Sequence, residues 1–298
     1  MLDVIDHSNH PTWTKVYKNL GRENGAATYS RDIVKFYIPV FEKLYGNKKT
    51  KVLVMTVTNC WDMTLKDYKK IFLFIHERGI NKEARELRLN RMKAFKKANP
   101  QAKVYFIVWH PVFAEELKKE GLNAIFLPMA IDTEYFQKYA ENPKKYNSRL
   151  IYFGNITKPK VKEFNKFKRT VNRRGWQLDY VSDNKYNGGF FRLKKDKIFW
   201  LVSQYKYGVA AGRAAQELSA MGVKVICPGY DTVLVPRTTE DAEDIMNRNC
   251  VSWAEDGESL DDFKKWISLQ GMRNLKPIHR DCRDMAKTLE QILINGKY

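Results

Sequence analysis

One stretch, residues 209–231 (VAAGRAAQELSAMGVKVICPGYD), limits the possible folds more than any other part of the chain. Gly212 precedes a run with the apolar spacing of a helix that packs closely on a sheet, formed by Ala214, Ala215, Leu218 and Met221. Gly222 ends that helix, and residues 223–227 form the β-branched run of a buried parallel strand. The stretch therefore predicts a helix, turn and strand of an α/β fold.

The same alternation of strands and helices continues along most of the chain. We expect strands at residues 2–5, 51–57, 71–75, 103–109, 123–127, 149–153, 176–181, 198–203 and 223–227. We expect helices at residues 29–45, 81–98, 161–174, 214–221 and 277–294. Strands separated by helices indicate doubly wound parallel sheets.

Length and composition allow two such domains. The chain has 298 residues, of which 44% are hydrophobic, and this is enough for two cores. No run approaches the ~20 apolar residues of a membrane span, and the N-terminal residues are too polar for a signal peptide. The four cysteines lack metal-site spacing and are expected to be reduced thiols in a cytoplasmic protein, with Cys227 and Cys250 in strands.

Positive charge is the strongest bulk property. The chain has 53 Lys and Arg against 34 Asp and Glu, a formal net charge of +19. Residues 144–197 alone contain 16 Lys and Arg and four acids. Such a surplus favours a polyanionic partner, and the alternative is a lysine-rich surface that serves solubility only.

Several polar residues follow predicted strands or precede a predicted helix. His76 and Glu77 follow the strand at 71–75, and His110 follows the strand at 103–109. The carboxyl ends of parallel strands line the ligand crevice of such sheets, so these are candidate functional residues, and the resemblance described below implies an acid–base role for them. Asn24 and Gly25 precede the helix at 29–45, where a helix N-terminus favours an anion. No set of residues has the spacing of a metal site.

The stretch at 209–231 resembles the nucleotide-sugar motif of GT-B glycosyltransferases. The resemblance places Gly212 at the donor site and Glu217 on the ribose hydroxyls of a UDP-sugar. The phrase at residues 127–136 (LPMAIDTEYF) resembles the linker that leaves the N-terminal domain of retaining members of this family. The fold class implied is α/β of GT-B type, two Rossmann-like parallel-sheet domains with a donor cleft between them. The expected domains are residues 1–132 and 133–276, with a terminal helix at 277–298 that crosses back to the first.

The resemblance also implies residues for the rest of the donor. Gly154 follows a predicted strand, and Lys160 matches the family's lysine for the diphosphate, with Lys158 and Arg213 as further cations. Asp183 lies in the region that binds the uracil ring. The chain departs from the family at Asn155, where arginine is usual, and at Val209, where a second glutamate contacts the transferred sugar.

Among family members, the chain is most similar in style to the T-even phage DNA alpha-glucosyltransferases. The run at residues 103–111 (KVYFIVWHP) resembles a strand of theirs that ends in His-Asp, although Pro111 replaces the aspartate. The resemblance implies a monomer in an infected bacterium that transfers sugar from UDP-glucose, or UDP-arabinose, to hydroxymethylated bases of double-stranded DNA. It implies no metal and no permanently bound cofactor.

Two other interpretations remain open at this point. The enzyme could act on a cell-surface glycan or lipid, with the basic face on anionic headgroups. Alternatively, the chain could be a non-catalytic DNA-binding protein on a GT-B scaffold, as the residues at Asn155 and Val209 suggest.

Overall fold

The chain forms two α/β units. The computed structural model describes residues 1–5, 25–56, 63–75, 82–154, 161–181, 195–229, 232–248, 250, 257–266 and 268–296. Unit 1 comprises Met1–Pro128 and Cys282–Tyr298, and unit 2 comprises Met129–Asp281. The sequence analysis placed these two divisions after residues 132 and 276. The predicted α/β class, with two domains built on parallel strands and joined by two chain crossings, is confirmed.

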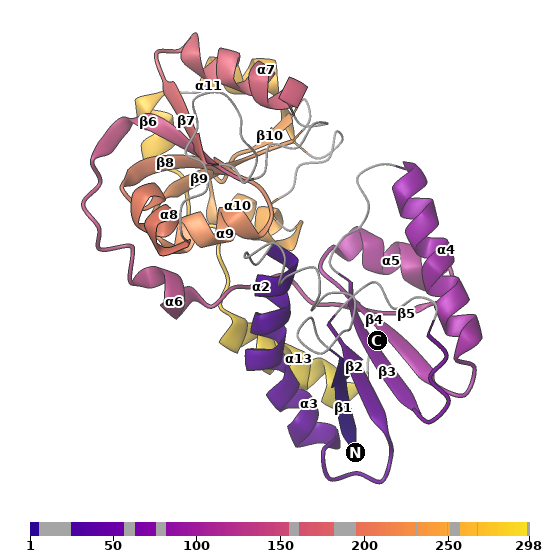
Figure 1. The fold of residues 1–298 in the computed structure, drawn as a ribbon. Coiled ribbons are helices and arrows are strands. Elements are labelled where there is room, and N and C mark those ends of the chain that lie inside the picture. Colours follow the sequence, from indigo (N-terminus) through magenta and orange to yellow (C-terminus); the bar gives the residue numbers. More distant parts are fainter. Residues whose placement is uncertain are drawn as a thin grey trace. The chain divides into compact units, whose positions relative to one another are not determined.

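Unit 1 contains a five-stranded parallel sheet whose strands lie in chain order (Figure 1). Its strands are β1 (Leu2–Ile5), β2 (Val52–Met55), β3 (Lys70–Ile75), β4 (Lys103–Val108) and β5 (Asn123–Phe126). Because the order never reverses among these described strands, unit 1 has no switch point of the kind that forms a ligand crevice in doubly wound sheets.

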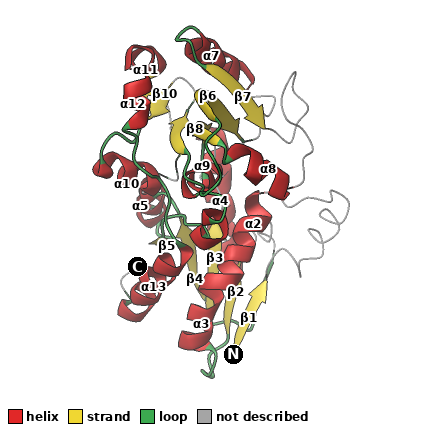
Figure 2. Cartoon of the chain, turned by 90° about the vertical axis from the view of Figure 1, so that its left-hand side faces the viewer, coloured by secondary structure: helices red, strands yellow, loops and turns green. Residues whose placement is uncertain are grey.

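Helices cover both faces of this sheet. On one face lie α4 (Lys82–Ala98) and α5 (Pro111–Lys119), which pack on residues such as Leu73 and Phe106. On the other face lie α2 (Gly25–Asp32), the π-helix η1 (Ile33–Tyr37) and α3 (Ile38–Tyr45). The ring of Phe41 lies 4.9 Å from that of Phe72, between centroids. Helix α13 (Cys282–Asn295) runs beside α3 (Figures 1 and 2).

Unit 2 contains a six-stranded sheet in the order β11-β10-β9-β8-β6-β7. Its strands are β6 (Tyr146–Phe153), β7 (Gln177–Val181), β8 (Tyr205–Ala210), β9 (Lys224–Pro228), β10 (Thr232–Leu234) and β11 (Glu258–Ser259). The four strands β6, β7, β8 and β9 are parallel to one another. Strand β10 pairs antiparallel with β9, and β11 pairs antiparallel with β10. The chain leaves β6 toward β7 and then returns to the other side of β6 as β8. The strand order therefore reverses between β6 and β8.

The two faces of this sheet are covered by different helices, seen side-on in Figure 2. One face is covered by α6 (Thr133–Gln137), α8 (Lys195–Val202), α9 (Arg213–Ala220) and α10 (Thr239–Asn247). The other is covered by α7 (Val161–Asn172), α11 (Leu260–Trp266) and α12 (Leu269–Arg273). Both faces are thus buried, which explains why β8 and β9 are apolar on both sides.

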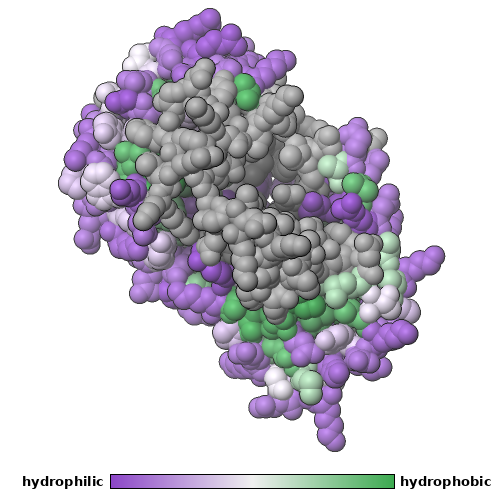
Figure 3. Space-filling view, viewed as in Figure 1, coloured by the Kyte–Doolittle hydropathy of each residue, from purple (hydrophilic) through white to green (hydrophobic). Residues whose placement is uncertain are grey.

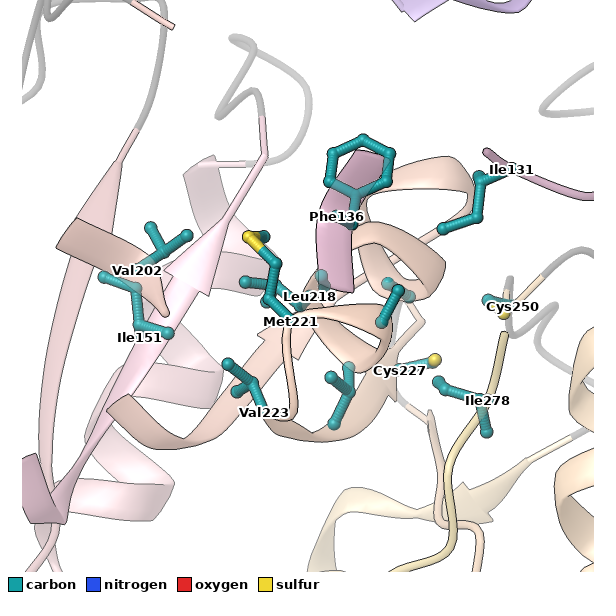
Figure 4. Packing of buried hydrophobic residues seen from close by; sticks show 14 of the residues in the cluster. Ile131, Phe136, Ile151, Val202, Leu218, Met221, Val223, Cys227, Cys250 and Ile278 are labelled. Carbon is teal, nitrogen blue, oxygen red and sulfur yellow. The ribbon is translucent and has the colours of Figure 1, made fainter. Parts of the chain in front are cut away.

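The larger core of unit 2 is centred on α9. Leu218 and Met221 are fully buried and contact residues from β6 and α8, such as Ile151 and Val202 (Figure 4). Cys227 belongs to the same cluster, where burial and a hydrogen bond with Cys250 raise the pKa of its thiol. Cys227, Cys250 and Cys282 are buried free thiols.

Close approach of α9 to the sheet depends on Gly208 in β8. A β-carbon at Gly208 would lie 2.9 Å from Leu218 Cδ1 and 3.0 Å from Val223 Cγ1, which is inside van der Waals contact. A larger residue at this position would force the Leu218 and Val223 side chains to shift. The predicted helix at 214–221 and strand at 223–227 therefore pack on β8, a strand that the sequence pattern does not predict.

One predicted element is wrong. Residues 198–203 were expected to form a strand, but Lys195–Val202 is helix α8. Phe199 and Val202 face the core, whereas Trp200 is exposed, so the short apolar run has helical rather than alternating burial. Short apolar runs do not distinguish a strand from a buried helix, and the central strand β8 begins only at Tyr205.

Three smaller differences concern element ends. Cys250 lies in a turn with a φ of 52° rather than in a strand. The helix expected at 29–45 begins at Gly25 and contains the π-helical segment η1. The terminal helix begins at Cys282, because residues 278–281 are held in an extended path by α9.

We expect Gly208→Ala to lower the free energy of unfolding by about 1–3 kcal/mol, because the added methyl group overpacks the contact with Leu218 and Val223. Urea denaturation measures the change. In a Leu218→Ala background the nearer contact is absent, so Gly208→Ala should cost at least about 1 kcal/mol less than in the native chain. An equal cost in both backgrounds would show that packing against Leu218 is not the cause.

Candidate functional site

Two glycines stand at the point where the strand order of unit 2 reverses. Gly154 follows β6, and Gly212 lies two residues beyond the end of β8. The two strands are neighbours, with Phe153 paired to Ala210, so both glycines lie at the same edge of the sheet. In open α/β sheets, the carboxyl edge at a switch point is where ligands bind.

Both glycines adopt backbone conformations that disfavour side chains. Gly154 has a φ of 152°, and its N–H donates to the carbonyl oxygen of Val181 at 3.3 Å. Gly212 has a φ of 61° and a ψ of −139°, a region occupied essentially by glycine alone. Its N–H donates to the carbonyl oxygen of Cys250 at 3.1 Å. The chain therefore makes two glycine turns beside each other where backbone can approach a ligand closely.

The N-terminus of α9 begins at this edge. Gly212 occupies the N-cap and has no side chain with which to cap the helix. The N-terminal end of a helix carries partial positive charge and outward-pointing N–H groups, which together favour an anion. The predicted donor-site residues Gly154 and Gly212 thus lie on adjacent strand ends, and Arg213 opens the helix behind them.

Arg213 and Glu217 form a buried ion pair one turn apart on α9. Arg213 Nε donates to Glu217 Oε1 at 2.7 Å, and only 9% and 10% of the two side chains are exposed. Burying a charge is costly unless it is paired and hydrogen-bonded, so the contact offsets part of the cost of burying both groups. A buried acid needs a partner, and the preceding turn of the same helix supplies Arg213 as the partner of Glu217.

Polar residues on α9 also bind the two segments by which the chain enters and leaves unit 2. The Gln216 side chain donates to the Met129 carbonyl oxygen at 3.1 Å and accepts from the Arg280 N–H at 3.2 Å. Ser219 Oγ accepts from the Ile278 N–H at 2.8 Å. The segments also pair with each other, because the Ile131 N–H donates to the Arg280 carbonyl oxygen at 3.0 Å.

His279 extends this group of contacts. Its Nδ1 lies 3.0 Å from Ser219 Oγ, whose lone pair is used by Ile278 N–H, so the hydroxyl proton can point to Nδ1 of a neutral ring. Burial lowers the pKa of His279 below the ordinary value of 6.5, and the Asp281 carboxylate opposes part of that shift. Asp281 itself accepts hydrogen bonds from the backbone N–H and hydroxyl of Thr133. A neutral His279 therefore suits this contact.

Two of the predicted residues of unit 1 flank elements that contact each other. His110 is the N-cap of α5 at the carboxyl end of β4 and is only 6% exposed. The neighbouring Trp109 ring lies 4.3 Å from the Tyr29 ring, between centroids. Tyr29 is one turn beyond Gly25 at the start of α2. The predicted glycine loop and His110 therefore belong to one neighbourhood of unit 1.

The remaining predicted residues fall outside the described part of the chain. These are Asn24, His76, Glu77, Lys158, Lys160 and Asp183. Val209, which stands where the family has its second glutamate, lies within the described residues. Its side chain is fully buried between the sheet and its helices.

The sequence analysis missed Gln216 and Ser219. Both are polar residues in a helix of small and apolar residues, and both are almost fully buried. A polar side chain in a helix that is otherwise expected to be buried requires a partner, and this was the available signal. Their partners lie more than 50 residues away in sequence, so the pattern could not name them.

Within the described ranges, no three His, Cys, Asp or Glu side chains gather as metal ligands would. No helix in those ranges is both long and apolar enough to cross a bilayer.

Comparisons with known proteins give distant likenesses of fold. No family model and no curated protein sequence matches the chain. Among solved structures, a Listeria monocytogenes protein assigned as a UDP-N-acetylglucosamine 2-epimerase is 12% identical, over 99% of this chain and 87% of that one, with a TM-score of 0.45. A structure of GsuK bound to ADP is 10% identical, over 67% and 63% of the two chains, with a TM-score of 0.25. Neither score is high enough to bear on function.

We expect the stability of the chain to fall in mild acid partly because of His279. A histidine whose folded pKa is depressed stabilises the fold above its unfolded pKa of about 6.5, and this contribution is lost as pH falls below that value. The free energy of unfolding, measured by urea at pH 7.5, 6.5 and 5.5, should decline more steeply for the native chain than for His279→Gln. Parallel declines in the two proteins would contradict the assignment.

Proposed function

We propose that the chain is a glycosyltransferase that uses a nucleotide sugar, with the donor diphosphate held by unit 2. One observation carries the proposal: Gly154 and Gly212 make adjacent turns at the reversal of strand order, with the N-terminus of α9 behind them. A nucleoside diphosphate suits such an edge because its phosphates need backbone N–H donors and positive charge.

The ion pair on α9 suits the two ends of the same ligand. The Arg213 guanidinium matches phosphate oxygens, and the Glu217 carboxylate matches ribose hydroxyls. Donor binding would therefore exchange the contact between Arg213 and Glu217 for contacts with the ligand, so that neither buried charge is left unpaired. Lys158, Lys160 and Asp183 complete the proposed donor residues, for the diphosphate and the uracil ring.

Sugar transfer releases a nucleoside diphosphate on which negative charge develops. The proposed cations Arg213 and Lys160 and the helix N-terminus would stabilise that charge in a site closed to water. His110, His76 and Glu77 are the proposed residues for moving the proton of the acceptor hydroxyl. His110 would act from the carboxyl end of β4 beside α2, where Gly25 opens the helix and Asn24 precedes it.

The acceptor that we propose is a hydroxymethylated base in double-stranded DNA, with UDP-glucose or UDP-arabinose as donor. The net charge of +19 supports this choice, because a duplex carries one phosphate per ~1.7 Å of its axis. Such an acceptor would place the enzyme in the cytoplasm of an infected bacterium, where the added sugar would protect phage DNA from nucleases.

A second candidate function is nucleotide and DNA binding without sugar transfer. Val209, at the position where the family has a glutamate on the transferred sugar, is buried in the core and cannot contact a ligand. A chain of this kind would bind UDP and DNA and leave both unchanged.

UDP binding tests the donor site. We expect Arg213→Gln to weaken UDP binding about 10- to 100-fold in calorimetry, because a hydrogen bond between charged groups contributes roughly 1.5–3 kcal/mol. Uridine, which has no phosphate, should bind this variant within about twofold of the native chain. Glu217→Gln should weaken both ligands about tenfold, and Glu240→Gln on the exposed start of α10 serves as the matched control. Equal binding of UDP to all four proteins would exclude α9 from the donor site.

Transfer is tested directly. Incubation with UDP-glucose or UDP-arabinose and duplex DNA containing hydroxymethylcytosine or hydroxymethyluracil should add one sugar to the nucleoside, detected by mass spectrometry after digestion. Absence of any mass gain, with UDP binding retained, would favour the second candidate. Transfer to a lipid or glycan acceptor instead would show that DNA is the wrong acceptor.

A further inference from the structure

Lysines gather at the amino edge of the unit 1 sheet, which is the edge opposite His110. Lys51 immediately precedes β2, Lys70 opens β3 and Lys103 opens β4. Lys70 is paired directly with Lys103, and Val52 with Lys70, so the three strand starts are level. Neighbouring strands lie about 4.8 Å apart, so Lys70 and Lys103 lie side by side at the edge, and Lys51 lies one residue beyond the same level, just before β2.

Loops and helix ends at this edge add more positive charge. The segments at residues 48–51, 66–70 and 96–103 contain nine lysines and a single acid, Asp67. We call these nine residues the lysine edge: Lys48, Lys49, Lys51, Lys66, Lys69, Lys70, Lys96, Lys97 and Lys103. Asp67 lies 3.9 Å from Lys51, at the limit of an ion pair, and the two side chains are 77% and 41% exposed. Most of the charge at this edge therefore has no acid to balance it among the described residues.

The lysines at the middle of the edge are held near one another. The Nζ atoms of Lys48 and Lys70 lie 5.3 and 5.0 Å from the centroid of the same ring, that of Tyr45. Partial burial, and then the positive charges of Lys48 and Lys103, lower the pKa of Lys70. The fold thus keeps three like charges together although they repel one another, and a bound anion would relieve that repulsion.

A hollow continues the lysine edge between α4 and the start of β4. It has a volume of about 360 Å³ and is lined by residues that include Lys93, Lys96, Lys97 and Ala102. Lys93 binds Glu120, and Lys96 donates to the Gly121 carbonyl oxygen at 2.7 Å. Lys97 has no such partner among the described residues, so it adds charge to the rim of the hollow. Lys93 and Lys96 therefore have structural partners within unit 1, and their presence at the hollow does not require a ligand.

We infer that the lysine edge is a docking surface for the phosphate backbone of a nucleic-acid duplex. Lysine is a compact point charge that binds phosphate without reading bases, and a row of lysines matches a row of phosphates. The contact would be independent of sequence and sensitive to salt.

An anionic membrane is the competing partner, and the surface lacks what a membrane contact requires. Peripheral binding uses large apolar side chains that enter the acyl region beside the basic residues. None of the exposed large hydrophobic residues of the described chain falls within the three lysine segments, and Met1 alone adjoins them, through its contact with Lys48. Two aromatic rings lie at this edge: Tyr45 is buried, and Tyr68 is half-buried, with its hydroxyl donating to the Asp3 carboxylate.

The lysine edge is separate from the candidate residues at the other edge of the same sheet. Strand β4 runs from Lys103 to Val108, a length of about 20 Å at 3.3 Å per residue, and His110 follows its far end. The lysine edge would therefore hold the DNA at a distance from the place where a base would react. The inference does not require sugar transfer, since it concerns unmodified backbone.

Binding of an unmodified 30-base-pair duplex to the full chain, followed by fluorescence anisotropy from 50 to 200 mM KCl, tests the inference. The triple variant Lys48→Gln, Lys70→Gln and Lys103→Gln should bind about 10- to 100-fold more weakly at 100 mM. The slope of log K against log salt should become shallower by about 2 to 3, because each phosphate contact contributes about 0.9. The variant should melt within a few degrees of the native temperature, because the relief of repulsion offsets the loss of the two contacts with the Tyr45 ring, and no described ion pair is lost.

A matched control removes the same charge from unit 2. Lys162→Gln, Arg173→Gln and Arg174→Gln change exposed residues on and just after α7 and should leave duplex binding within about twofold. Equal weakening by both triple variants would mean that net charge alone drives binding. Unchanged duplex affinity of the lysine-edge variant would show that the lysine edge is not the docking surface. Lysine-dependent binding to phosphatidylserine vesicles without duplex binding would assign the surface to a membrane. UDP calorimetry on the same variant should match the native chain, so failure here is distinguishable from failure of the donor site.

Discussion

The close contact between α9 and β8 is the interaction on which the rest of unit 2 depends. It exists because Gly208 has no side chain, so Leu218 and Val223 can occupy the space where a methyl group would lie. The same helix presents Arg213 and Glu217 at the candidate donor edge and uses Gln216 and Ser219 to hold the segments that enter and leave the unit. One short helix therefore packs on the central strand, presents residues at the candidate donor edge and anchors the two segments that enter and leave unit 2.

Parallel strands explain why the candidate sites of this protein lie at sheet edges. All carboxyl ends meet at one edge and all amino ends at the other, so residues that flank strands anywhere in the sequence become neighbours. In unit 2 this brings Gly154 and Gly212 together at the reversal of strand order. In unit 1 it brings Lys70 and Lys103 side by side at the amino edge, with Lys51 just before the neighbouring strand. The glycine edge favours close approach of a ligand backbone, and the lysine edge favours long-range attraction.

Elements with a strong local signal were predictable. The small-residue helix at 214–221 and the strand at 223–227 correspond to α9 and β9 within one residue at each end. The helix at 81–98 corresponds to α4 in the same way. The run at 198–203 was not predictable, because an apolar segment of six residues is compatible with either period. Strand β8 was missed because Gly208, which makes the packing possible, also weakens the pattern of a strand.

The sequence by itself determined the fold class, the existence of a Gly-bounded helix carrying a buried acid, and the large excess of positive charge. These properties follow from composition and from spacings of a few residues, which act locally. Only the tertiary structure decided that Glu217 pairs with Arg213, that Val209 is core, that Gln216 binds Met129 and Arg280, and that Lys70 pairs with Lys103 at the amino edge of unit 1. The physical reason is that these contacts are set by strand order and register, which join residues tens to hundreds of positions apart.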